Sequence, residues 1–245
     1  MALIKVGSLN DFVVRTERIS EEISAPSGNA DILDYMGRSG GSSYSEDIQS
    51  LSSEQRGLAL KKIQLTKGGL FQKFFKSTSE LYFVAWTWDF SGQPINQYPG
   101  AGVAAGSVLI PMTVGTIREF IGVGINLFPQ RIVSGGIAVR IQVWESDKDI
   151  QNFGKAMSET ADAIKKSELS NLLAAISLAT GGAVASIAVI ERASLELAGA
   201  IGTILKTNGD DYVDLFEGYY PAPKNWTTGD EKYKGNASVI TLNKY

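Results

Sequence analysis

The sequence predicts a mainly β protein, an antiparallel β-sandwich with one α-helical hairpin inserted at about residues 148–208. Apolar residues alternate with period two through much of the chain after Arg56, the period becomes 3.6 in the inserted stretch, and alternation then returns. A chain of 245 residues is long enough to bury one large core. We therefore assign residues 1–147 and 210–245 to the sandwich, and residues 148–209 to the helical insertion.

Three segments carry the clearest strand patterns. Residues 81–88 are rich in aromatic and β-branched side chains, which predicts a strand with both faces at least partly covered. In residues 120–128, Ile121 and Val123 begin a row of alternate apolar positions, and residues 137–144 show a similar row. Each of these last two patterns predicts a half-buried antiparallel strand, with turn residues between them.

The insertion has helical periodicity. Apolar residues recur every three or four positions through residues 150–164, which predicts an amphipathic first helix. A second helix is expected over residues 167–181 and a third over residues 183–206. The dipeptide Asn208-Gly209 then supplies a left-handed helix stop.

The remaining segments complete the predicted sandwich. Strand periodicity resumes in residues 212–216 and 237–242, so the β framework closes after the insertion. A short strand-like run lies at residues 12–14. Residues 24–56 are polar and include the Gly/Ser-rich stretch 37–43, which predicts a flexible loop or arm.

The composition excludes several classes of function. The chain has no histidine and no cysteine, so it cannot form a Ser-His-Asp or Cys-His pair, a disulfide, or a zinc site with imidazole or thiolate ligands. Its 23 basic and 26 acidic residues give a net charge of −3, so we expect no nucleic-acid binding. A metal held by this chain would need oxygen ligands, which favours calcium or magnesium.

One group of acidic residues predicts such a metal site. It comprises the residues that flank the insertion, which are Glu145, Asp147, Asp149, Asp210 and Asp211. If the strands before and after the insertion are antiparallel neighbours, both halves of the group lie at one end of the sandwich. Carboxylates that crowd together repel one another, and a calcium ion would remove that cost. Asp89 joins the group only if its strand ends at the same edge.

The spacing of these acids resembles the calcium-binding loops of C2-type β-sandwiches, where acidic residues cluster on loops at one end. That resemblance implies membrane binding through the ion, and it covers only these few positions. The competing interpretation is structural. Asp147 and Asp149 are suited to begin a helix, and Asp210 and Asp211 to follow a helix stop in a solvated turn.

Other features allow a binding role. Residues 169–190 contain no charged side chain, so they could pack on a sheet or another subunit or enter a bilayer, although Gly181-Gly182 divides them into short pieces. The glycines in residues 100–106 lack the ending of a phosphate-binding loop, and we interpret them as a flexible loop. Five aromatic side chains could stack on sugars or cations, although aromatic residues more commonly pack in cores. They are Trp86, Trp88, Tyr219, Tyr220 and Trp226.

We therefore expect a non-catalytic binding or self-assembly protein with a calcium-dependent edge and a helical contact surface. The expected partners are further copies of the chain or another protein, and a membrane surface remains an option. The alternative is a pore-forming toxin whose helical hairpin inserts into lipid. A sugar-hydrolysing enzyme with two opposed carboxylates is a third, weaker option. The N-terminal sequence lacks a secretory signal, so we expect a cytoplasmic location or export by a non-classical route.

Overall fold

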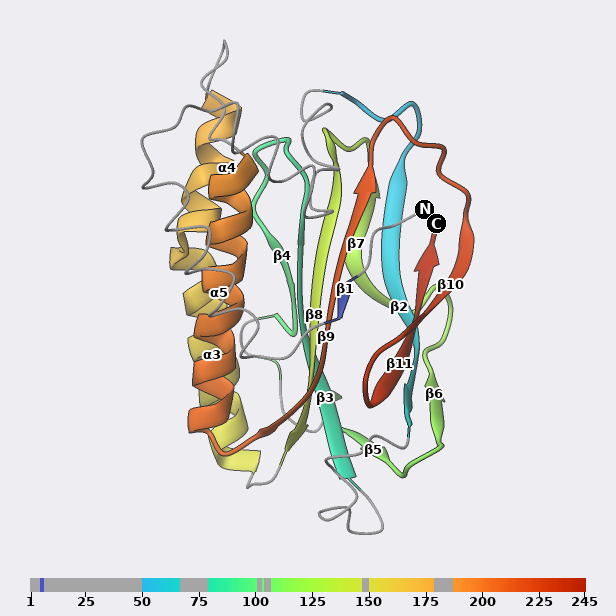
Figure 1. The fold of residues 1–245 in the computed structure, drawn as a ribbon, viewed down its shortest axis with the longest axis vertical. Coiled ribbons are helices and arrows are strands. Elements are labelled where there is room, and N and C mark those ends of the chain that lie inside the picture. Colours follow the sequence, from blue (N-terminus) through green and yellow to red (C-terminus); the bar gives the residue numbers. More distant parts are fainter. Residues whose placement is uncertain are drawn as a thin grey trace.

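The protein is a β-sandwich with a helical hairpin inserted between two neighbouring strands, as predicted. The computed structural model describes residues 5–6, 50–66, 79–100, 103, 107–146, 150–178 and 187–245. Figure 1 shows three layers, with the helices on one side, a first β-sheet beside them and a second sheet beyond it. The predicted strand at residues 12–14, and most of the predicted arm over residues 24–56, lie outside the described residues.

The first sheet is the middle layer, and its described strand pairs are antiparallel. Strand β3 has both faces buried, because Phe83 packs in the core between the sheets while Tyr82 and Trp86 pack beneath the helices. The prediction that residues 81–88 are covered on both faces is thus confirmed. The order is β1-β9-β8-β3-β4 with β5 also on β3, and the bounds are β1 Lys5–Val6, β3 Ser79–Trp88, β4 Asn96–Tyr98, β5 Ile110–Met112, β8 Gly136–Ser146 and β9 Asp211–Pro221.

The second sheet forms the outer β layer. Strands β6 and β7 follow one another along the same edge of β2, since β6 pairs with residues 62–64 and β7 with residues 56–60. The opposite edge is β10, where charged side chains at alternate positions are exposed and blunt the edge against pairing with other chains. The bounds are β2 Arg56–Leu65, β6 Ile117–Glu119, β7 Ile125–Arg131, β10 Gly229–Lys234 and β11 Ser238–Lys244.

Strand β8 departs from the half-buried prediction. Ile137, Val139, Ile141 and Val143 do share one face, which packs in the core between the sheets. The other face is buried as well, because the helices cover it. Its polar side chains have partners there, since Gln142 donates to the Ala198 carbonyl at 3.0 Å and Arg140 lies 3.0 Å from the Glu217 carboxylate. The polar positions of β8 therefore belong to a hydrogen-bonded and charged network under the helices, and they do not form a solvent-exposed face.

The insertion consists of three helices arranged as a bent hairpin. Helices α3 (Ile150–Lys166) and α4 (Glu168–Leu178) form one arm with a break at Ser167, whose hydroxyl accepts from the Ser170 amide at 3.1 Å. Helix α5 (Ile187–Thr207) returns beside both (Figure 1). The predicted stop is confirmed, since Gly209 has φ of 92° and the Asp210 amide donates to the Leu205 carbonyl at 3.2 Å.

The prediction for residues 120–128 is wrong at its start. Strand β7 begins only at Ile125, and Ile121 and Val123 are exposed instead of sharing a buried face. The cause is the backbone of the intervening glycines, because Gly122 has φ of 63° and Gly124 has φ of 106°. Those conformations produce a turn where the alternation predicted extended chain.

A buried carboxylate fastens the first sheet to the second. Asp214 on β9 accepts hydrogen bonds from the amides of Asn236, Ala237 and Ser238 at 2.8, 3.0 and 2.6 Å, and from the Ser238 hydroxyl at 2.7 Å. These donors precede and begin β11 in the second sheet. Gly235 is required beside them, since a Cβ there would lie 2.6 Å from Asp214 Oδ2.

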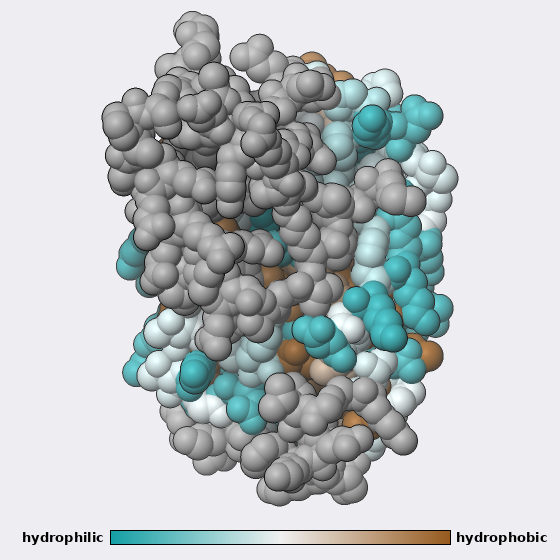
Figure 2. Space-filling model, in the orientation of Figure 1, coloured by the Kyte–Doolittle hydropathy of each residue, from teal (hydrophilic) through white to brown (hydrophobic). Residues whose placement is uncertain are grey.

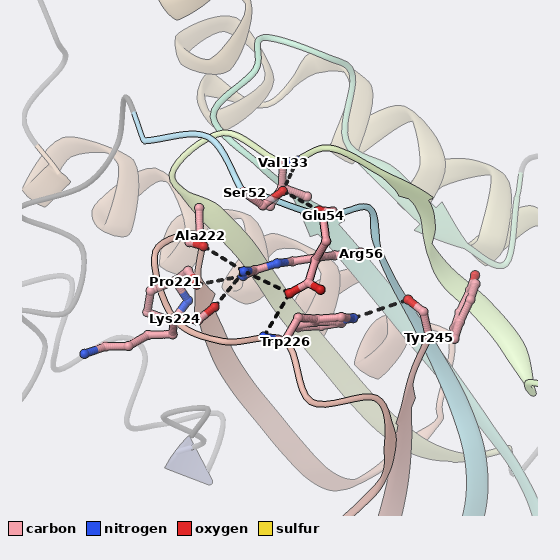
Figure 3. A network of polar contacts seen from close by, with 9 residues as sticks. All are labelled: Ser52, Glu54, Arg56, Val133, Pro221, Ala222, Lys224, Trp226 and Tyr245. Carbon is pink, nitrogen blue, oxygen red and sulfur yellow. Dashed lines mark hydrogen bonds and ion pairs between the residues drawn. The ribbon is translucent and has the colours of Figure 1, made fainter.

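A buried arginine fastens the segment that follows β9. Figure 3 shows Arg56 donating to the carbonyls of Pro221, Ala222 and Lys224, at 2.8, 2.7 and 2.6 Å. Its guanidinium also lies 5.3 Å from the centre of the Trp226 ring. Burial lowers the pKa of Arg56 from its ordinary value, and the charge of the neighbouring Glu54 carboxylate opposes that shift. The network ties the start of β2 to the connection between the two sheets.

Candidate functional site

The predicted acidic site lies where the helical insertion joins the first sheet, and we call this region the rim. Glu145 near the end of β8 and Asp211 at the start of β9 are paired residues in the antiparallel ladder. The insertion thus leaves and re-enters the sheet at adjacent positions, as the site prediction required. Glu145 is largely buried and Asp211 is exposed. Like charges placed directly opposite each other on neighbouring strands destabilise the pair.

Asp210 is held on the helix-facing side of the rim. It is only 3% exposed, and its Oδ2 accepts hydrogen bonds from the Tyr82 hydroxyl at 2.6 Å and the Asn208 amide at 3.0 Å. Burial, and then the neighbouring Asp210 charge, raises the pKa of Tyr82, so the phenol stays protonated and donates. Within the part of the chain that the structure describes, Asp210 Oδ1 has no hydrogen-bond partner. The Asp210 carboxylate therefore uses Oδ2 to bind Tyr82, and its Oδ1 can still accept a hydrogen bond.

The other predicted ligands are only partly placed. Asp147 and Asp149 lie outside the described residues. Within the described part of the chain, no three Asp or Glu side chains lie close enough together to hold a metal ion. Asp89 follows β3 at the end remote from Glu145, since Glu145 pairs with Leu81 near the start of that strand. It does not join the rim, and its Oδ1 accepts from Ser91 at 2.6 Å and from Arg131 at 3.0 Å.

The five aromatic residues considered as a stacking surface are buried and belong to two separate cores. Trp86, Trp88 and Tyr219 pack beneath the helices, whereas Tyr220 and Trp226 pack between the sheets. They therefore serve the fold as packing groups. Among the described residues, the indole nitrogens of Trp86 and Trp88 have no hydrogen-bond partner.

The sequence interpretation missed an apolar surface along the free edge of the second sheet. Among the described residues, the exposed large hydrophobic side chains are Leu51, Val114, Ile117, Ile121, Val123 and Ile132. Five of them lie between residues 114 and 132, on β6, the connection to β7, and the ends of these strands. The sixth, Leu51, forms a bridge with Ser134 just beyond β7. The signal that could have found this surface is the pair of glycines at alternate positions, which marks a bulge more often than a regular strand.

The helices present a different kind of surface. Phe153, Met157 and Ile164 on α3 are buried against the sheet, while Lys155 and Glu159 face outward and lie 3.7 Å apart. The described part of α5 exposes Thr203 and Lys206. No described helix is both long enough and apolar enough to span a bilayer. The described apolar residues of α3 are packed within the molecule.

Comparison with known proteins adds little to this geometry. No family model matches the sequence, and no curated protein matches it. Among solved structures, a similar chain is human GIVD cytosolic phospholipase A2 in complex with methyl gamma-linolenyl fluorophosphonate inhibitor and terbium chloride. The TM-score is 0.30 at 5% sequence identity, over 80% of this chain and 17% of that chain. A likeness this low carries no argument about function, so the proposals below depend on this chain's own residues.

Proposed function

We propose that this protein is a non-catalytic binding or self-assembly module whose rim binds calcium. The observation that carries the proposal is the direct pairing of Glu145 with Asp211 at the point where the insertion leaves and rejoins the sheet. Asp147 and Asp149 follow Glu145 by two and four positions in the sequence, and we propose them as further oxygen ligands of the same ion. Within the described residues, Glu145, Asp210 and Asp211 do not lie close enough together to hold an ion by themselves, so Asp147 and Asp149 would complete the ligand set. Calcium accepts six to eight oxygen ligands and tolerates irregular geometry, which suits such a set.

A binding role fits what the buried charged groups do. Asp214, Arg56 and Asp89 hold turns and strands together through hydrogen bonds with backbone groups or neighbouring side chains. Each side chain is thus committed to the fold. Self-assembly is the expected use of the rim, because a calcium ion at the end of a sandwich can accept its remaining oxygen ligands from a second molecule.

The test is thermal unfolding in millimolar calcium chloride and in EDTA. An ion that binds only the folded protein raises the melting temperature by mass action. Calcium should therefore raise the melting temperature by several degrees. Asp211→Asn and Asp147→Asn should abolish the rise. Asp162→Asn is the matched control, because Asp162 is an exposed carboxylate on α3, far along the helix from the rim. The absence of any calcium-dependent shift in the unchanged protein would remove the metal site.

Sedimentation velocity under the same conditions tests assembly. We expect a larger species in calcium that disappears in EDTA and in the Asp211→Asn variant. If the protein stays a monomer under every condition but its melting temperature still depends on calcium, the protein binds calcium and does not self-assemble. Release of a dye from lipid vesicles, abolished when the hairpin is locked at Gly181-Gly182, would instead favour the pore-forming toxin.

A further inference from the structure

The connection between β6 and β7 carries a fully exposed isoleucine at its apex. Ile121 is 98% exposed, and its neighbours Ile117 and Val123 are 55% and 43% exposed. We call residues 117–124 the β6–β7 apex. Such a large apolar side chain in water is unfavourable, and neighbouring exposed apolar residues mark sites of interaction.

The apex is held in a defined shape. The Lys61 ammonium donates to the carbonyls of Phe120 and Gly122 at 2.9 and 2.7 Å, and the Phe120 amide donates to the Lys61 carbonyl at 2.9 Å. A side chain at Gly124 is excluded, since its Cβ would lie 2.3 Å from the Leu60 carbonyl oxygen. Ile121 is therefore presented on a fixed turn, and no ordering of the backbone is needed before it makes a contact.

Basic side chains surround this apolar group. Lys61 and Lys62 lie beside one carboxylate, Glu119, at 3.4 and 3.2 Å, and Arg118 precedes Glu119 on β6. Arg118 is exposed and donates to the Pro111 carbonyl at 2.9 Å, which leaves its charge uncompensated by that contact. Three cations against one carboxylate make this edge positive, although the whole chain has a net charge of −3. A negatively charged partner complements it.

These features oppose docking of a second copy on this edge. Strand β6 has three residues, and the turn at the apex interrupts the edge before β7 begins. Pro129 lies within β7 and has no amide to donate. Two copies would also bring two positive edges together. Interruptions, proline and lysine are the devices that prevent strands from pairing between molecules.

We propose that the β6–β7 apex docks on a lipid surface that contains anionic lipids. Ile121 enters the boundary between headgroups and acyl chains, with Val123 and Ile117 beside it. Lys62 and Arg118 lie against the negative headgroups. The surface in Figure 2 is mainly hydrophilic on the side where β10 lies, so a shallow attachment through one small apolar apex fits the molecule. Binding of this kind increases with buried apolar area and with attraction to anionic lipids, and it is weak and reversible.

The experiment is sedimentation of the protein with phosphatidylcholine vesicles that contain or lack phosphatidylserine, in EDTA so that the rim is not engaged. We expect binding to the phosphatidylserine vesicles that falls as salt is raised. Ile121→Ser should weaken binding by about tenfold or more, the ratio expected for withdrawing one buried isoleucine side chain. Arg118→Gln should weaken it about fivefold on phosphatidylserine vesicles. Leu51→Ser is the matched control, because Leu51 is 68% exposed but lies beyond the far end of β7, and its binding should be unchanged.

Four results would overturn the inference. The first is no binding by the unchanged protein to either vesicle. The second is equal binding by Ile121→Ser and the unchanged protein, with the same unfolding midpoint for both. The third is binding that requires calcium and is lost in Asp211→Asn but kept in Ile121→Ser, which would assign the membrane contact to the rim. The fourth is a dimer whose formation depends on Ile121, which would make a second copy of the chain the partner of the β6–β7 apex.

Discussion

Replacing Asp214 by Asn tests how the two sheets are fastened. The carboxylate is fully buried and accepts hydrogen bonds from three successive backbone amides and one hydroxyl. The best placement of the amide oxygen is at Oδ2, which keeps the bonds from Ala237 and Ser238. The amide nitrogen then faces the Asn236 amide, so one bond is lost and two donors oppose each other. A hydrogen bond to a charged group contributes about 1.5–3 kcal/mol, and we expect a loss of about 2–4 kcal/mol.

Urea unfolding followed by circular dichroism and tryptophan fluorescence measures this loss. The slope of the transition should stay constant while the midpoint falls. Asp162→Asn is the control, since that carboxylate is exposed and lies 3.4 Å from Lys166 one helical turn away, a pair that contributes no more than about 0.5 kcal/mol. If Asp214→Asn unfolds at the same urea concentration as the control, the carboxylate does not fasten the sheets and the reasoning fails.

Three further substitutions test other features of the fold. Gly235→Ala should destabilise the protein by about 1–3 kcal/mol, because its Cβ would lie 2.6 Å from Asp214 Oδ2. Gly154→Ala on α3 should stabilise the protein by up to about 1 kcal/mol, because its Cβ meets nothing within 4 Å and alanine favours a helix more than glycine does. Chemical unfolding measures both free energies, and a change of the same sign in the two variants would contradict this reasoning. Burial alone would raise the pKa of Glu231, but hydrogen bonds from Lys244 and Tyr233 lower it below its ordinary value of 4.5. The stabilising effect of the Glu231 carboxylate is therefore present above its unfolded-state pKa and is lost as the pH falls through its folded-state pKa. Glu231→Gln should lower the free energy of unfolding by about 1 kcal/mol or less at pH 7 and leave it unchanged at acidic pH, and chemical unfolding at the two pH values measures this difference.

The sequence predicted the order of the elements because the period of its apolar residues changes sharply at the insertion. It also predicted the rim, since an insertion between neighbouring antiparallel strands must begin and end at one edge. It could not predict that Asp210 lies on the helix-facing side. That placement follows from the hydrogen bond between the Asp210 amide and Leu205, and from Tyr82, which is 128 positions away along the chain.

The β6–β7 apex shows a second limit. Alternation of Ile121 and Val123 with glycine satisfies the pattern of a strand, and period alone cannot distinguish a glycine that faces solvent from one with positive φ. What decides between them is Lys61, whose ammonium holds two carbonyls of the turn. Because that lysine belongs to a strand some sixty positions earlier, the contact is set by the tertiary fold.

The way the insertion packs also limits where a partner can bind. Phe153 meets the Tyr82 ring edge to face with centroids 4.9 Å apart, and Met157, Ile164 and Leu205 are buried in the same core. Burial of each such side chain stabilises by about 1.5–3 kcal/mol, so these few contribute an amount comparable with the whole stability of an ordinary domain. Release of the helices would also uncover the charged pair of Arg140 and Glu217 beneath them. Any helix that enters a bilayer must recover that free energy, whereas the rim and the β6–β7 apex can bind partners while the three layers stay intact.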